Sequence, residues 1–489
     1  MKKILELTDK HFMSGIAPSS QLQNKGLWHK ALGVTVMRDI FLESDNVGLL
    51  QAAPLPTNIT NSVIQDVPIA WTVDPQDATT GFGKLYIWDK AGNLYVIGLV
   101  GDNMPTKLTS GGQGAAANGL FLIKHSTGTQ KLYYFREADL GYYGNLAATP
   151  SFHTADYSTD IQSTPYHPTH RLFDRTYFGN GRYIGTVADN GSGGIDVVAK
   201  ALDIEIDQRV NCLSDDGTYL VAGITTNKST DSLSRGLTRI IFWDTNQSSW
   251  QREWPIPDAS IIAIKRVGGH MEAVTTRGVF AFTFDSPPQQ VLPYLLSADT
   301  PSYSYPGQFA VDVLGEALLF GGNNRVSTFG KMIPQMPTAY FQPFSGFGTD
   351  DVTLVASSAK TNDIIVGTSG SKLYRVKANG APQTGVSAET IYMDLQRWWQ
   401  IGRIVVEFDG QLATGDDLSI QVRPDDGTSA KTWGSATFTA NGAIRTKEIY
   451  NTQEAEKLKV ILNFNGGSPR IRNLEIWGDP IERPTHTRV

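Results

Sequence analysis

Residues 363–380 read DIIVGTSGSKLYRVKANG, and this stretch decides the fold class. Residues 364–366 form an apolar strand, Thr368-Ser369-Gly370 supply a turn, and residues 372–376 form a second strand. Asn379-Gly380 then follows, a dipeptide suited to the type I′ turn of a two-residue hairpin. The stretch therefore predicts consecutive antiparallel hairpins, which is the unit from which all-β repeat architectures are built.

The same order of strand, Gly/Asn/Asp turn and strand recurs along most of the chain. Further copies lie at residues 84–98, 119–135, 182–206, 217–254, 271–285 and 316–330. Inner strands are expected near residues 70, 121, 184, 221, 273, 319 and 366. Their mean interval of about 49 residues is typical of β-propeller blades. We therefore expect an irregular β-propeller of about seven blades over residues 61–382, with six or eight blades left open.

Two of the repeats contain a Trp-Asp step at the end of a strand, at Trp88-Asp89 and Trp243-Asp244. The Gly-His pair that accompanies this step in WD40 repeats is absent. The pattern thus indicates a propeller without assigning it to the WD40 family. A closed ring also accounts for the repeats physically, because closure buries both faces of each blade and removes exposed sheet edges.

Three segments depart from the repeat. Residues 136–170 are rich in Tyr, Ser, Thr, His and Pro, which predicts a long loop inserted between blades two and three. Residues 1–60 fit no blade and are expected to form an N-terminal arm that pairs with a neighbour or supplies the strand that closes the ring. Residues 383–489 show short alternating runs separated by Gly and Asp turns, which predicts a jelly-roll-like β-sandwich.

The composition agrees with an all-β protein made inside the cell. The 489 residues include 48 Gly and 24 Pro, and 18% of them are charged. The single cysteine, Cys212, excludes an internal disulfide and is expected to be buried as a small hydrophobic residue. The start MKKILELTDKHF lacks the apolar core of a secretory signal, and no stretch has the ~18 apolar residues of a membrane helix. We therefore expect cytoplasmic synthesis and no membrane insertion.

The residue types that catalysis or metal binding needs are present without the required patterns. The acidic doublets are explained by turn chemistry, since Asp bonds to its own backbone in turns: Asp215-Asp216, Asp350-Asp351, Asp416-Asp417 and Asp425-Asp426. His167 and His170 form an H-x-x-H pair, but no nearby Cys or Glu completes a metal site, and a surface loop is the preferred interpretation. Nucleotide-binding and hydrolase motifs are absent. The sequence predicts no catalytic, cofactor-binding or metal-binding residues, and hence no enzyme.

Aromatic clusters are the remaining candidates for a binding surface. Tyr and Trp are enriched in protein interfaces, and they can also stack on sugars. Buried, the same residues would be ordinary core, and the sequence leaves both alternatives open. The candidate interface residues are Tyr142, Tyr143, Tyr157, Trp398 and Trp399.

Two C-terminal segments resemble a known family. MDLQRWWQIGRIVVEFDGQLATGDDLSIQVRPDDG (393–427) and RIRNLEIWGDP (470–480) are similar to C-terminal β-sandwich domains of tailed-bacteriophage virion proteins, and the preceding propeller resembles that of podovirus tail nozzle proteins. The resemblance implies a ring-forming, non-catalytic tail subunit (nozzle, hub or fibre adaptor) located in the virion. It also implies homo-oligomerisation, contacts with adaptor and fibre proteins, and transient contact with DNA during ejection.

The net charge of −6 argues against a protein that coats nucleic acid, although DNA could still slide past such a surface. An alternative function is a carbohydrate-binding or glycan-degrading propeller that recognises the host surface. A further alternative is a scaffold propeller that binds a host protein.

Overall fold

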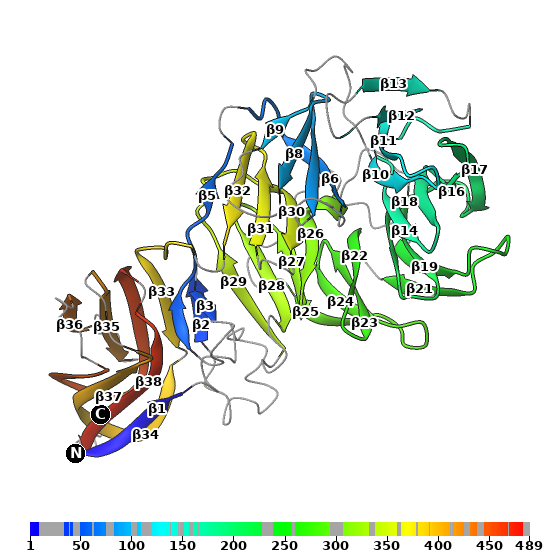
Figure 1. The fold of residues 1–489 in the computed structure, drawn as a ribbon. Coiled ribbons are helices and arrows are strands. Elements are labelled where there is room, and N and C mark those ends of the chain that lie inside the picture. Colours follow the sequence, from blue (N-terminus) through cyan, green and yellow to red (C-terminus); the bar gives the residue numbers. More distant parts are fainter. Residues whose placement is uncertain are drawn as a thin grey trace. The chain divides into compact units, whose positions relative to one another are not determined.

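The fold was obtained as a computed structural model, and it is almost entirely β-strand (Figure 1). The structure describes residues 1–8, 34–38, 40–42, 49–60, 63–74, 83–98, 105–108, 119–136, 138–144, 146, 151–155, 160–164, 166–226, 238–256, 260–293, 307–331, 338–358, 363–377, 380–390, 392–410, 412, 415–424, 431–437, 445–467 and 469–482. Within these ranges no helix has the length and apolar character needed to cross a membrane.

Seven four-stranded antiparallel sheets follow one another along the chain, each built from consecutive strands except the last. We number them as blades one to seven. Blades one to four consist of β6 (Pro68–Asp74), β7 (Lys84–Asp89), β8 (Leu94–Gly98) and β9 (Thr106–Lys107); β10 (Gly119–Lys124), β11 (Gln130–Arg136), β12 (Asp139–Gly144) and β13 (Ser151–Ala155); β14 (Thr169–Leu172), β15 (Arg175–Asn180), β16 (Tyr183–Asp189) and β17 (Ile195–Asp203); and β18 (Gln208–Asp215), β19 (Leu220–Thr226), β20 (Thr238–Trp243) and β21 (Arg252–Ile256).

Blades five and six have the same arrangement, and blade seven takes its fourth strand from the N-terminal segment. Their strands are β22 (Ile261–Val267), β23 (His270–Thr275), β24 (Gly278–Phe282) and β25 (Gln289–Pro293); β26 (Val311–Leu314), β27 (Glu316–Gly321), β28 (Val326–Lys331) and β29 (Ala339–Phe344); and β30 (Val352–Ser358), β31 (Asp363–Thr368), β32 (Lys372–Val376) and β5 (Thr57–Asn58). The 3-10 helix η4 (Gly307–Ala310) precedes β26.

The first strand of each blade contacts the first strand of the next, and the cycle β6, β10, β14, β18, β22, β26, β30 returns to β6. The seven-bladed propeller predicted from the repeats is therefore confirmed. Apolar side chains fill the seams between neighbouring blades, as a ring of mutually dependent sheets requires. At the seam between blades one and two, for example, Trp88 stacks on Tyr134 with ring centroids 4.8 Å apart.

β5 closes the ring. Its residues Thr57 and Asn58 pair antiparallel with Arg375 and Tyr374 of β32, the third strand of blade seven. Leu354 and Ile365 of this blade pack with Leu85 of blade one in a common core. Blade seven thus combines strands from both ends of the propeller segment. β5 covers the edge of β32 that would otherwise be free.

Two details differ from the sequence-based expectations. Residues 136–170 are not one inserted loop, because β12, β13 and the start of β14 lie within them. Two of the tyrosines that suggested a loop, Tyr142 and Tyr143, belong to β12 of blade two. The predicted inner strands near residues 70 and 121 are first strands, whereas the other five positions lie on second or third strands of their blades.

The chain divides into two compact units, one of Pro56–Val326 and Phe347–Ala378 and the other of Met1–Leu55, Ser327–Gly346 and Asn379–Val489. The second unit contains a ten-stranded antiparallel sheet. Its strands are β1 (Lys2–Leu7), β2 (Val34–Arg38), β3 (Ile40–Leu42), β4 (Leu50–Ala52), β33 (Val386–Thr390), β34 (Met393–Phe408), β35 (Asp417–Pro424), β36 (Lys431–Thr437), β37 (Thr446–Gly466) and β38 (Ile471–Pro480).

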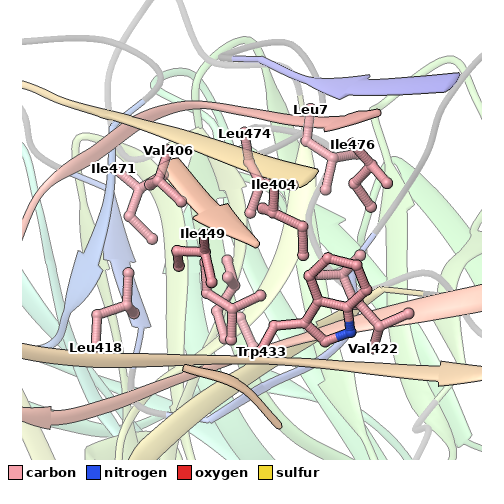
Figure 2. Close-up of a cluster of buried hydrophobic side chains, with 14 of the residues drawn as sticks. Leu7, Ile404, Val406, Leu418, Val422, Trp433, Ile449, Ile471, Leu474 and Ile476 are labelled. Carbon is pink, nitrogen blue, oxygen red and sulfur yellow. The ribbon is translucent and has the colours of Figure 1, made fainter. Parts of the chain in front are cut away.

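The predicted C-terminal sandwich is confirmed only in part, because its strands form one curved sheet. The long strand β37 pairs along its first half with β34 and along its second half with β33 and β35. The sheet thereby wraps around a core to which both halves contribute, with Ile404 and Ile476 facing Trp433 and Val422 (Figure 2). β1 and β2 pair with β38 and β33, so residues expected to form a separate arm complete this sheet.

Candidate functional site

A cavity of about 390 Å³ lies on the axis of the propeller, where the first strands of blades one to five meet η4. This volume falls within the range of small-molecule sites. The lining residues are Trp71, Thr72, Val73, Leu120, Phe121, Leu122, Thr169, His170, Arg171, Thr176, Leu213, Ser214, Ile264, Lys265, Gln308 and Phe309. They come from six strands, the first strands of five blades and β15, and from one helical turn, so ring closure itself builds the cavity.

The lining has a consistent sign of charge. Its charged side chains are Lys265 and Arg171, and no Asp or Glu is among the lining residues. Lys265 Nζ lies 3.7 Å from Asp312 Oδ1 and 5.6 Å from the centre of the Trp71 ring. Asp312 itself is held by blade seven, because its Oδ2 accepts hydrogen bonds from the amide (2.7 Å) and hydroxyl (2.9 Å) of Ser357. The lysine ammonium therefore occupies a defined place beside an aromatic face.

His170 is oriented by the neighbouring blade. Its Nε2 lies 2.6 Å from Oδ2 of Asp215, and both side chains are about three-quarters buried. The hydrogen bond to His170 lowers the pKa of the Asp215 carboxyl below its usual range, and the Gly217 amide adds to the effect. The pair links blades three and four at the cavity wall.

η4 places a neutral polar group in the cavity. The indole Nε1 of Trp71 donates a hydrogen bond of 2.9 Å to the carbonyl of Phe309, which fixes η4 against blade one. Gln308 lines the cavity and is 9% exposed, and its Oε1 has no hydrogen-bond partner among the described residues. A buried amide oxygen without a donor costs free energy, and native structures satisfy most such atoms.

A second candidate surface lies on the C-terminal sheet. Tyr450, Arg403 and Trp477 are register partners across β37, β34 and β38, and we call them the aromatic–arginine row. The Arg403 guanidinium lies over the Trp477 ring at 4.6 Å from its centre. Side chains alternate between the faces of a strand, and the next residue, Ile404, points into the core. The row therefore occupies the outer face.

Ion pairs surround this row. Arg403 Nη1 lies 3.5 Å from Oε2 of Glu448, and the Tyr450 hydroxyl donates to the same carboxylate. That hydrogen bond raises the pKa of Tyr450 above its ordinary value. Trp477 donates through Nε1 to Glu475, which pairs with Lys3 of β1. Tyr450 remains 63% exposed, so a large aromatic surface faces solvent next to an ordered arginine.

The predicted tyrosine cluster separates into different environments. Tyr143 is completely buried and packs against Trp88 and Tyr134, so it belongs to the core between blades one and two. Tyr142 points to the other face of β12, where it is half-buried beneath Lys131, whose Nζ lies 4.4 Å from the ring centre. Tyr157 lies outside the described residues.

The predicted tryptophan pair is also divided. Trp399 is 7% exposed, and its Nε1 donates to the Leu395 carbonyl. Trp398, the next residue of β34, is half-buried, and its carbonyl accepts the Ile481 amide at 3.1 Å. Tyr143 and Trp399 are therefore core residues. The prediction that they belong to an interface is wrong.

The two histidines of the H-x-x-H pair do not converge on a shared ligand position. His167 is fully buried, with Nδ1 2.7 Å from the Gly179 carbonyl and its ring stacked on Phe135. His170 belongs to β14 and pairs with Asp215. The described residues contain no cluster of three or more His, Cys, Asp or Glu that could hold a metal ion.

Turn chemistry explains the doublet Asp215-Asp216, whereas Asp350 makes an ion pair and Asp417 begins strand β35. Asp216 accepts hydrogen bonds from the amides of Thr218 and Tyr219, so it caps the turn between β18 and β19. Asp350 pairs with Lys372, and the Asp351 amide donates to Ser369. Asp425-Asp426 lies outside the described residues. Cys212 is buried, as expected.

Sequence reasoning missed the cavity residues and the aromatic–arginine row. Lys265 stands in an apolar strand, IIAIKRV, and a charged residue in such a run was a usable signal for a special environment. Gln308 had no such signal, because it lies in a short turn whose place on the axis depends on ring closure. The row joins residues from three distant strands, which single-sequence periodicity cannot bring into register.

No protein-family model matches the chain. No curated protein matches it either. Among solved structures, one similar to this chain is the crystal structure of BBS1N in complex with ARL6DN, with 12% identity, a TM-score of 0.44 and coverage of 64% of this chain and 93% of that chain. Another is the Neurospora crassa Pan2 WD40 domain, with 10% identity, a TM-score of 0.45 and coverage of 68% and 97%. Both similarities concern the propeller architecture alone.

Proposed function

We propose that the protein is a non-catalytic structural subunit of a bacteriophage tail, where copies form an oligomeric ring around the DNA channel. The resemblance of residues 393–427 and 470–480 to phage virion domains supports this assignment. The observation that carries the proposal is the aromatic–arginine row, because two of its three residues, Arg403 and Trp477, lie in those same segments. Tyr, Trp and Arg are the residues in which interfaces concentrate their binding energy.

The occupant of this face is a neighbouring copy of the same chain. The ion pairs around the row present both signs of charge, since Lys3 and Arg403 lie beside Glu475 and Glu448. A surface of this kind offers charged groups of both signs to a different face of the next copy, and such a heterologous contact between identical subunits generates a ring when its rotation closes. Adaptor and fibre proteins would then bind the faces of the assembled ring.

The electrostatic balance fits a passage for DNA. The chain carries a net charge of −6, and a protein that retains DNA needs many lysine and arginine contacts to phosphates. A ring of negatively charged subunits would let DNA pass without holding it. The chemistry of the described polar groups is also that of a scaffold, because Asp215, Asp216 and Asp350 hold turns and neighbouring blades together.

Mass spectrometry of purified tailed particles from a lysate that contains the protein tests the assignment. The protein should copurify with the particles through density gradients at a stoichiometry of several copies per tail. Absence from particles that eject DNA normally would contradict a tail role. Catalytic turnover of a glycan substrate by the pure protein would contradict the non-catalytic part of the proposal and favour the glycan-degrading alternative.

A further inference from the structure

We propose that the axial cavity of the propeller binds a small hydroxylated anion, of the chemical class of sugar acids and sugar phosphates. This binding function is separate from the assembly role proposed above, because the cavity lies within the propeller unit and the aromatic–arginine row lies in the other unit. Three features of the cavity support this binding: the charge of its lining, one unsatisfied polar group, and its size and rigidity.

The charge of the lining selects an anion. Lys265 and Arg171 line the cavity, and no acidic residue is among the lining residues. The ion pair that Lys265 makes with Asp312 is long, at 3.7 Å, and Asp312 Oδ2 is already occupied by two donors from Ser357. The ammonium group of Lys265 therefore retains hydrogen-bonding capacity toward the cavity. Charge-assisted hydrogen bonds to carboxylate or phosphate oxygens are stronger than those between neutral groups.

The unsatisfied oxygen selects a hydroxyl group. Gln308 Oε1 is an acceptor, it is buried, and it has no donor among the described residues. A sugar hydroxyl donates one hydrogen bond and accepts others, so it can satisfy this acceptor. Thr72, Thr169 and Ser214 add polar groups to the lining. A ligand that joins a hydroxylated ring to one anionic group satisfies both requirements.

The volume and the apolar lining of the cavity fit one sugar ring. About 390 Å³ accommodates a monosaccharide derivative, and Trp71, Phe121 and Phe309 supply apolar surface on which the CH face of a sugar ring can pack. The site is also preorganised. The Trp71–Phe309 hydrogen bond fixes η4, and the His170–Asp215 pair fixes the wall between blades three and four. Little conformational entropy would be lost on binding.

Isothermal titration calorimetry of the intact chain tests the proposal with D-glucuronate, D-glucose 6-phosphate, D-glucose and inorganic phosphate as probes. We expect saturable binding of glucuronate or glucose 6-phosphate at one site per chain, and the stronger of the two identifies the ligand as a sugar acid or a sugar phosphate. Glucose and inorganic phosphate should bind at least about tenfold more weakly, since each lacks one of the two recognised groups.

Two variants assign the binding to the cavity. K265Q removes the charge but keeps a polar side chain, and Q308M replaces the amide by an apolar group of similar length. Each should weaken binding about tenfold or more, while K200Q should not, since Lys200 lies on β17 with its ammonium paired to Asp160. Thermal melting verifies that each variant is folded.

Three outcomes would overturn the proposal. The first is no heat of binding for either sugar derivative at millimolar concentrations by folded protein. The second is binding that K265Q and Q308M leave unchanged. The third is binding of inorganic phosphate as tight as that of glucose 6-phosphate, which would remove the role of the hydroxyl groups. The oligomeric state of the same samples distinguishes a failure of this site from a failure of the assembly role.

Discussion

The amide of Ile59 donates a hydrogen bond of 2.9 Å to the carbonyl of Leu373. Ile59 directly follows β5, and Leu373 belongs to β32, so this bond lies at the seam where both ends of the propeller segment meet. Thr60 continues the contact, because its Oγ1 accepts the Leu373 amide at 3.0 Å and lies 3.4 Å from the Leu373 carbonyl. The closure of the ring thus depends on a few main-chain groups.

T60V should weaken this closure. Valine has the shape of threonine but no hydroxyl, so the amide of the fully buried Leu373 would lose its acceptor. Such a loss costs about 1–3 kcal/mol. Urea denaturation of the variant should show this decrease in the free energy of unfolding. T218V, at an exposed turn, is the matched control, and an equal effect of both substitutions would contradict a special role for Thr60.

A buried ion pair stabilises the last blade. Arg375 is 2% exposed and donates through Nε (2.9 Å) and Nη2 (2.6 Å) to Oδ2 of Asp363. D363N would remove the carboxylate that this buried guanidinium contacts, at a cost of about 3–5 kcal/mol. The double variant D363L/R375M should recover much of that loss, since it removes both charges. Denaturant unfolding of the three proteins checks this, and a double variant less stable than D363N would refute it.

The contact between blades two and three should depend on acid pH. Tyr133 Oη, His125 and Asp189 form a chain of hydrogen bonds, with 3.0 Å from Oη to Nε2 and 2.8 Å from Nδ1 to Oδ1. The bond to His125, together with the Ser126 amide, holds the pKa of Asp189 well below its usual range. A lowered pKa in the folded state contributes stability above the unfolded value of about 4 and loses it as the pH falls further.

D189N should therefore destabilise the protein at neutral pH, and the difference in melting temperature from the wild type should shrink below about pH 4. D196N, which alters an exposed carboxylate on the adjacent β17, is the control. A difference between D189N and the wild type that stays constant down to the most acidic pH at which both fold would show that Asp189 does not contribute in its ionised form.

Cys212 should be unreactive in the native state. It is completely buried in β18, and burial raises the pKa of its thiol to about 12. The thiolate is the reactive form, so a disulfide reagent such as DTNB should label no thiol in the native protein and one after denaturation. Because the chain has a single cysteine, the labelling rate also reports the opening of blade four. Rapid labelling under native conditions would contradict the packing described here.

The repeats were visible in the sequence because hairpins carry two local signals, alternation of apolar residues and Gly/Asn/Asp turns. The stretch 363–380 shows both, and it forms β31 and β32. The first strand was harder to identify in blades three to seven. In blades four to seven the predicted inner strand is the second strand, because the hairpin that contains it has the turn signal. The strand before it has only the pattern of an ordinary apolar run, as β22 does.

Some strands form only because of long-range pairing, and the local sequence pattern does not predict them. β5 consists of Thr57 and Asn58, two exposed residues with no strand pattern, and only its pairing with β32 makes it a strand. Similarly, β37 runs unbroken from Thr446 to Gly466 through the polar stretch NTQEAEK, which reads as a gap between two strands. The axial cavity and the aromatic–arginine row both depend on such long-range register, so neither could be predicted from local pattern.

The central claim is that copies of this chain assemble through the aromatic–arginine row, and multi-angle light scattering tests it most directly. The wild-type protein should elute as a single species whose mass corresponds to three or more copies of the 53.4 kDa chain. R403A/Y450A should dissociate it, because hot-spot truncations cost about 2 kcal/mol or more per contact. Y392A, which removes an exposed tyrosine outside the row, should leave the mass unchanged. A monomeric wild type, or a ring that R403A/Y450A leaves intact, would contradict the claim.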